Sequence, residues 1–220
     1  LNALSMFIMP DYKIVSIEDT AELNLPHENW IPSVARMGFG SNQAEISLFD
    51  LLKAAMRQRS DYIIVGEVRG EEAYTLFQAM ATGHGGLSST HADSVAASIK
   101  RLESEPMNIP RTLISGIDLI TVQNRVSLGS NPVRRTVVTS EIVGLDPRSR
   151  EILTNEVYKW NAADDIFEFT GRSYLLERIA TKKGIDMDEA NEEIQRRTEL
   201  FEWLSKKNIR GYREVSNFIR

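Results

Sequence analysis

Short apolar runs rich in β-branched residues alternate with helical stretches through the first half of the chain. The runs are residues 12–17 (YKIVSI), 62–65 (YIIV) and 87–91, and the helices are expected at 48–59, 71–81 and 94–103. Neighbouring parallel strands need a long crossover, which is usually a helix. The alternation therefore predicts an α/β fold built on a parallel sheet. Residues 20–45 carry prolines and glycines without a clear period, and we expect a long loop there.

A further strand is expected at 119–123, and the pattern then changes. Apolar and polar residues alternate in the strands expected at 135–145, 151–160 and 166–169. A period of two is typical of an antiparallel meander with one solvated face. From Ser173 to the end, the apolar residues follow a helical period. We therefore expect a core domain at 1–170 and a C-terminal helical subdomain at 171–220.

The composition excludes several kinds of site. None of the 220 residues is a cysteine, so the chain has neither disulfides nor thiolate metal ligands. The formal net charge of −5 offers no footprint for non-specific binding to nucleic acid, and we expect no nucleic-acid partner. No apolar run approaches the roughly 20 residues that a membrane-crossing helix needs. We therefore expect a cytoplasmic protein.

Two adjacent carboxylates, Glu18 and Asp19, follow the first predicted strand. In open parallel sheets, ligands bind at the carboxyl ends of the strands. A carboxylate pair at such a position could orient a water molecule or hold Mg²⁺ through its waters. A helix cap or a solvated turn is the simpler alternative.

A third carboxylate, Glu67, follows the strand at 62–65 after a single glycine. This is the Walker B arrangement of P-loop nucleotide hydrolases, whose acid lies by Mg²⁺ and the γ-phosphate. Gly66 would let the backbone come close. The alternative is an ordinary surface glutamate at the end of a buried strand.

Two histidines, His84 and His91, flank the third predicted strand. Glycines on both sides of His84 permit a tight turn, and its imidazole could report on phosphate charge. We expect its strand to lie beside the nucleotide edge of the sheet. Zinc is a competing ligand, but the histidines are seven residues apart and form no H-E-x-x-H pattern. A hydrogen-bonded structural histidine is the further alternative, above all for His91.

These three segments, in this order, resemble the Asp box, Walker B motif and His box of the type II/type IV secretion ATPase superfamily. The stretches 16–23 (SIEDTAEL) and 25–30 (LPHENW) are most similar to archaeal flagellum (archaellum) and pilus assembly ATPases. The resemblance implies a RecA-like P-loop ATPase core with an antiparallel β extension and a C-terminal helical appendage. It also implies ATP and Mg²⁺ as cofactors.

By this resemblance, Glu18 and Glu67 are the acidic catalytic pair and hold Mg²⁺, in part through water, and His84 is the third catalytic residue. The expected nucleotide-binding residues are Asp19, Arg57, Arg59 and His91. Relatives carry an arginine shortly before the Walker B strand that serves the nucleotide site or its neighbour, and the two arginines are the candidates for it. A solvated helix face is the alternative for both.

The phosphate-binding loop G-x-x-x-x-G-K-[ST] occurs nowhere in the 220 residues. In the resembled family, that loop precedes the Asp box by one helix, and residues 2–9 resemble the end of such a helix. We therefore expect a C-terminal fragment that is inactive alone. A complete but degenerate homologue is the alternative.

The resemblance implies an ATP-hydrolysing motor that powers protein secretion or the assembly of a pilus or archaellum filament. Intact, it would be a homohexamer at the inner face of the cell membrane, acting on a polytopic membrane platform protein. A non-catalytic interaction module of a secretion complex, docking through the acidic helical region at 186–207, is the main alternative. A nucleic-acid translocase of the same fold is the second.

Overall fold

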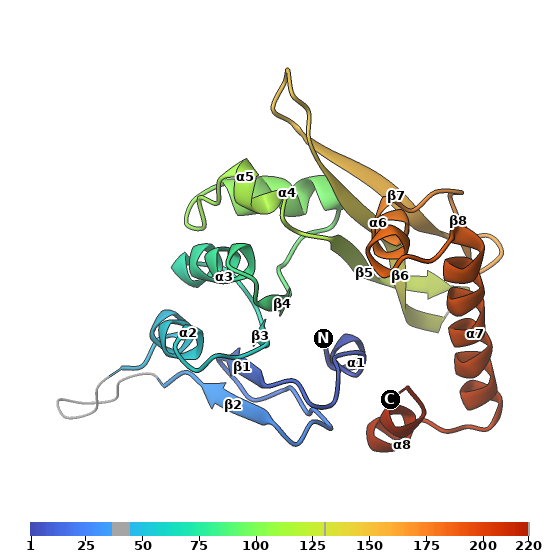
Figure 1. Cartoon of the computed structure of the whole chain (residues 1–220), viewed down its shortest axis with the longest axis horizontal. Helices are drawn as coiled ribbons and strands as arrows, with labels where there is room; N and C mark the ends of the chain where they lie inside the picture. Colours follow the sequence, from blue (N-terminus) through green and yellow to red (C-terminus); the bar gives the residue numbers. More distant parts are fainter. Residues whose placement is uncertain (37–44, 130, 220) are drawn as a thin grey trace. The chain divides into compact units, whose positions relative to one another are not determined.

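The computed structural model describes residues 1–36, 45–129 and 131–219 (Figure 1). The chain forms two compact units. The first comprises Leu1–Thr90, Glu105–Asn108 and Glu199–Arg220, and the second comprises His91–Ser104 and Ile109–Thr198. The predicted boundary after residue 170 lies inside the second unit, and the division into domains 1–170 and 171–220 stays a prediction.

The first unit contains a four-stranded parallel sheet in the order β2-β1-β3-β4. Its strands are β1 (Ile14–Glu18), β2 (Trp30–Val34), β3 (Tyr62–Val65) and β4 (Gly85–Ser88). The helices α2 (Leu48–Met56) and α3 (Glu71–Ala81) connect its strands, after a short α1 (Asn2–Ser5). The predicted α/β fold with a parallel sheet is therefore confirmed.

Strand β2 lies where a long loop was expected, so that part of the prediction is wrong. β2 is an edge strand that pairs in parallel with β1, and its side chains are only partly buried. An edge strand tolerates a proline such as Pro32, because one of its sides needs no donors. The indole N–H of Trp30 donates to the Ser16 hydroxyl at 2.8 Å and fixes the pairing. The glycines at 38 and 40 of the expected loop lie outside the described residues.

The central strands and helix α2 follow from local sequence. The apolar side chains of Ile14, Ile17, Ile63 and Ile64 are fully buried. At the start of α2, the Ser47 hydroxyl accepts from the Asp50 amide and the Asp50 carboxylate accepts from the Ser47 amide, both at 3.2 Å. This reciprocal pair is a capping box.

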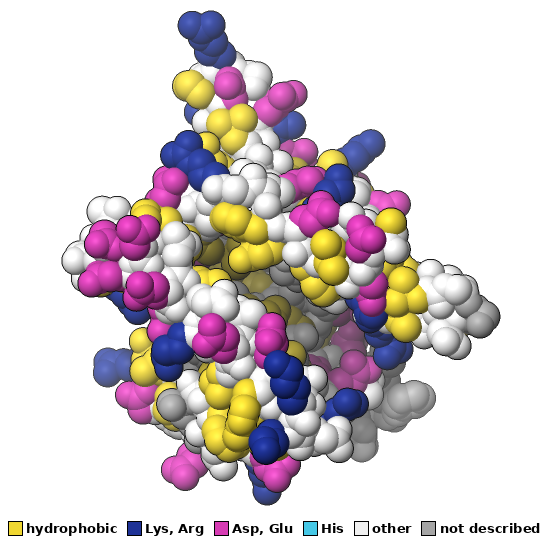
Figure 2. Space-filling model, turned by 90° about the vertical axis from the view of Figure 1, so that its right-hand side faces the viewer, with side chains coloured by type: hydrophobic (Ala, Val, Ile, Leu, Met, Phe, Trp, Pro, Cys, Tyr) yellow, Lys and Arg dark blue, Asp and Glu magenta, His cyan; other side chains and the backbone are white. Residues whose placement is uncertain are grey.

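The second unit contains the predicted antiparallel meander, which the strand expected at 119–123 joins, in the order β5-β6-β7-β8. Its strands are β5 (Leu119–Leu128), β6 (Asn131–Leu145), β7 (Ile152–Asn161) and β8 (Ile166–Phe169). β5 and β6 are longer than expected, since each supplies the partner that the other needs. The exposed turn between β6 and β7 carries Arg148 and Arg150. Figure 2 shows basic, acidic and apolar side chains interspersed over one face of the molecule.

The remaining elements are helical. The short α4 (Val95–Glu103) and α5 (Arg111–Ile114) precede the meander, and α6 (Tyr174–Lys183), α7 (Met187–Lys206) and α8 (Tyr212–Ile219) follow it. The predicted helical character from Ser173 onward is thus confirmed. Within the described ranges, no helix has both the length and the apolar character that a bilayer crossing requires.

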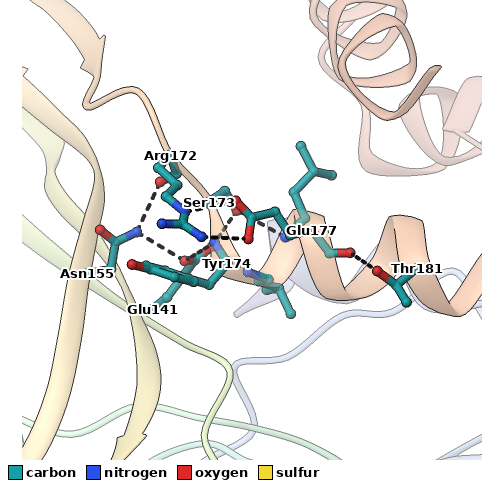
Figure 3. A network of polar contacts seen from close by, with 9 residues as sticks. Glu141, Asn155, Arg172, Ser173, Tyr174, Glu177 and Thr181 are labelled. Carbon is teal, nitrogen blue, oxygen red and sulfur yellow. Dashed lines mark hydrogen bonds and ion pairs between the residues drawn. The ribbon is translucent and has the colours of Figure 1, made fainter. Parts of the chain in front are cut away.

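A buried carboxylate fixes the start of α6 to the meander (Figure 3). Glu141 on β6 is 2% exposed. It accepts hydrogen bonds from the amides of Tyr174 and Leu175, the Ser173 hydroxyl and the Asn155 side chain. These donors include amide groups that lack partners within the helix. The first turn of α6 is therefore capped by a side chain from a distant strand.

Candidate functional site

The carboxyl ends of β1 and β3 meet at one edge of the parallel sheet. The register pairs Ile17 with Val65, so the residues that follow the two strands lie side by side. Glu18 is the last residue of β1, Asp19 follows it, and Glu67 comes two residues after β3. The structure therefore places all three of these acidic residues at the carboxyl edge of the sheet, where the sequence predicted them.

Glu18 is held in a fixed position. Its side chain is buried, and Oε1 accepts hydrogen bonds from the amides of Glu22 at 3.1 Å and Leu23 at 3.0 Å. A Cβ atom at Gly66 would lie 3.1 Å from Cγ of Glu18. The glycine before Glu67 therefore makes room for the neighbouring carboxylate.

Asp19 forms an ion pair with Arg69, a residue that the sequence analysis did not single out. The guanidinium Nη2 donates to Oδ2 of Asp19. Both side chains are accessible, with 54% of Arg69 and 40% of Asp19 exposed. The sequence did contain a hint, because Arg69 lies only two positions after Glu67.

Glu67 lies half-buried on a segment that is fastened to the residues after β4. The Val68 amide donates to the Ser89 carbonyl at 2.9 Å. In return, the Ser89 hydroxyl donates to the Gly66 carbonyl at 2.6 Å. The peptide units on both sides of Glu67 are therefore held by one residue, Ser89.

The strand that follows His84 lies beside β3, as expected, but His84 itself lies at the opposite edge of the sheet from the carboxylates. His84 comes directly before β4, and β4 pairs in parallel with β3 so that Gly85 faces Tyr62, the first residue of β3. A residue that precedes a parallel strand lies at the amino edge, opposite the carboxylates. The Nδ1 atom of His84 lies 3.1 Å from the Ala79 carbonyl, where an N–H can donate at the end of α3.

The glycines around His84 serve packing more than flexibility. Gly83 has a φ of 106° and completes the turn after α3. Gly85 and Gly86 lie in β4, which begins two residues before the predicted strand and ends before His91. A Cβ atom at Gly85 would lie 2.5 Å from the Tyr62 ring, and one at Gly86 would lie 2.3 Å from Sδ of Met80.

Arg57 and Arg59 also lie away from the carboxylates. They follow α2 and precede β3, at the amino edge of the sheet, and both are exposed. The Lys13 ammonium donates to the Gln58 carbonyl at 2.7 Å, which places this corner beside the residue before β1. His91 follows β4, is exposed and begins the second compact unit.

The family of the chain follows from comparison with known proteins. The family model described as "Type II/IV secretion system protein" matches residues 1–217. The chain belongs to this family. The predicted resemblance to the type II/type IV secretion ATPases is therefore confirmed, while a particular closeness to the archaellum branch stays a prediction.

Among its relatives in this family, an uncharacterized protein of Methanocaldococcus jannaschii is 52% identical over 206 residues, which are 94% of this chain and 76% of that protein. The type IV secretion system protein PtlH of Bordetella pertussis is 37% identical over 150 residues, covering 62% of this chain and 44% of PtlH. Among solved structures, the VirB11 ATPase of the Brucella suis type IV secretion system, in complex with sulphate, has a TM-score of 0.50 and 26% identity.

The chain spans less than half of several of these proteins. It covers 42% of the VirB11 chain, and 61% of the chain takes part in that match. A second uncharacterized protein of M. jannaschii, 39% identical, is covered to 40% of its length. The similarity therefore concerns one part of the longer relatives.

Glu18, Asp19 and Glu67 offer carboxylate oxygens, which are the kind of ligand that Mg²⁺ prefers. Within residues 1–36, 45–129 and 131–219, however, no three histidine or acidic side chains converge as a ready-made metal site. Mg²⁺ in nucleotide sites commonly takes one or two carboxylates and completes its shell with waters and phosphate oxygens. Glu18, Asp19 and Glu67 fit that incomplete role. The nucleotide would bring the remaining ligands.

Proposed function

We propose that the protein containing this chain is an ATP-hydrolysing motor of a secretion, pilus or archaellum assembly system. The observation that carries the proposal is the placement of Glu18, Asp19 and Glu67 at the carboxyl edge of a parallel sheet. Ligands of open α/β sheets bind at this edge. The relative VirB11 is named an ATPase of a type IV secretion system.

Glu18 and Glu67 have different roles at this edge. Glu18 is buried and held by two amides, so it presents a fixed negative charge. Glu67 stands on a braced segment after β3 and is the better placed to orient the attacking water. Bound Mg²⁺ would neutralise charge on the phosphates, while the protein contributes position and preorganised charge.

Arg57 and Arg59 fit the second of the two roles expected of them. Since both lie at the amino edge of their own sheet, they are better placed to serve the nucleotide of a neighbouring subunit. This requires the protein to form a ring, and a homohexamer is the proposed assembly. We propose that the ring acts from the cytoplasm on a polytopic membrane platform protein.

The deciding experiment compares ATP hydrolysis by the full-length protein with that of Glu67→Gln. We expect the variant to bind Mg-ATP and to lose hydrolysis by about a hundredfold or more, because glutamine keeps the shape and loses the charge. Glu71→Gln, an exposed acid at the start of α3, is the matched control and should hydrolyse normally. Near-normal turnover by Glu67→Gln would assign this residue to structure.

The chain by itself tests the role of the phosphate loop. Residues 1–220 contain no G-x-x-x-x-G-K-[ST], so we expect weak binding of Mg-ATP in calorimetry and no turnover. Steady phosphate release from the purified chain would contradict this. If the full-length protein also fails to hydrolyse ATP, the alternative of a non-catalytic interaction module is favoured.

A further inference from the structure

The backbone of Arg69 is fixed by hydrogen bonds, while its guanidinium group is accessible to solvent. Its backbone amide donates to Oε1 of Glu72 at 2.7 Å, and the Gly70 amide donates to the same oxygen at 2.7 Å. Glu72 is 7% exposed, and a Cβ atom at Gly70 would lie 2.9 Å from its Oε2. The backbone of Arg69 is therefore fixed by a buried carboxylate, while its guanidinium reaches out to Asp19.

This guanidinium is a positive charge that the chain places among the carboxylates. The segments that end β1, β3 and β4, residues 14–23, 64–72 and 86–93, contain Arg69 as their single lysine or arginine, and Arg36 follows the edge strand β2 at the same edge. The same segments contain Glu18, Asp19 and Glu67. A bound nucleotide would add further negative charge to this edge, where Arg69 is the cation nearest in sequence to Glu67.

The ion pair of Arg69 with Asp19 is of the kind that exchanges easily. Exposed pairs between arginine and a carboxylate contribute little to stability. A phosphate oxygen carries more charge than a carboxylate oxygen, and the planar guanidinium can bind phosphate with two parallel hydrogen bonds. The Arg69 guanidinium is therefore held by a weak ion pair with Asp19, and Arg69 lies only two residues from Glu67.

We propose that Arg69 is a positioning residue that exchanges Asp19 for the terminal phosphate of a bound nucleoside triphosphate. With no nucleotide or with a diphosphate, the guanidinium stays on Asp19. With a triphosphate, it moves to the terminal phosphate and frees Asp19. This inference rests on the proposed function and adds a residue that discriminates the triphosphate from the diphosphate.

The test is calorimetric titration of the full-length protein in the Glu67→Gln background, so that ATP is not consumed. Adding Arg69→Ala should weaken Mg-ATP binding by about tenfold or more and change Mg-ADP binding by less than about twofold. Arg69→Lys should restore part of the difference, because it keeps the charge and loses the planar fork. Arg178→Ala removes another exposed arginine–aspartate pair, with Asp118, and should leave both affinities unchanged.

Equal weakening of ATP and ADP, or no change in their affinity ratio, would overturn the inference. If Arg69→Ala melts much earlier than its parent, Arg69→Lys alone decides: an unchanged ratio of affinities then speaks against the exchange. The two proposals fail separately. A full-length protein that neither binds nor hydrolyses ATP refutes the proposed function. A protein that does both but keeps its affinity ratio in the arginine variants refutes only the role of Arg69.

Discussion

The carboxylate of Glu141 accepts a hydrogen bond of 2.8 Å from the backbone amide of Tyr174, 33 residues further along the chain. The bond joins the middle of β6 to the first turn of α6. A buried charge is tolerated at this position because four donors converge on it.

Replacing this carboxylate should be costly. Glu141→Gln puts an NH₂ group among donors and removes the charge that strengthens their bonds, so we expect the free energy of unfolding to fall by about 2 kcal/mol. Urea denaturation measures it. The control is Glu177→Gln in α6. The ion pair of Glu177 with Arg172 is exposed, so its loss should lower the free energy of unfolding much less. Equal losses would mean that the Glu141 cap contributes nothing special.

Acid should weaken the β7–β8 end of the meander through Asp165. The hydrogen bonds from the Arg135 guanidinium and the Trp160 indole lower the pKa of Asp165 from 3.8 to about 2. Since the folded pKa is depressed, the stabilisation is present above pH 3.8 and is lost as the pH falls toward about 2. Denaturation midpoints measured between pH 5 and 2 should therefore fall less steeply in Asp165→Asn than in the wild type.

The two glycines of β4 should differ in their tolerance of alanine. Gly85→Ala drives a methyl group into the Tyr62 ring, which cannot bend away, and we expect a loss of about 1–3 kcal/mol. Gly86→Ala meets the side chain of Met80, whose rotatable bonds let it move. Thermal denaturation of both variants should rank Gly85→Ala as the less stable. The reverse order would show that the ring yields and the thioether does not.

The histidines should separate stability from turnover. His84→Ala removes a hydrogen bond at the end of α3, so we expect a loss of about 1 kcal/mol in stability and normal ATP hydrolysis by the full-length protein. His91→Ala changes a residue beyond the carboxyl end of β4, and we expect hydrolysis to fall by about tenfold or more. Loss of hydrolysis in a stable His84→Ala protein would restore the sensor role that the sequence suggested.

The local sequence pattern was sufficient to predict the elements whose apolar side chains are nearly completely buried. The run YIIV at β3 and helix α3 were predicted at their observed bounds, and the start of α2 at residue 48 was predicted as well. Strand β2 escaped prediction because its partly exposed residues are held by pairing with β1, which no local period reveals.

The acidic residues of the site were predictable from the sequence, whereas the role of Arg69 was not. Each carboxylate follows an apolar run that a single sequence shows clearly. Arg69 and Glu72 act through contacts across the loop, and such contacts leave no period in the sequence. The placement of His84 was a topological error, since any residue directly before a parallel strand lies at the amino edge.

Two hydrogen bonds join Ser89 to the loop that carries Glu67, and they restrict how that loop can move. The Val68 amide and the Gly66 carbonyl both bind Ser89, so the loop cannot shift without either losing two hydrogen bonds or pulling Ser89 along. One residue later, at Thr90, the chain leaves the first compact unit. A displacement of the Glu67 loop would therefore be felt at Ser89, two residues before the second unit begins at His91.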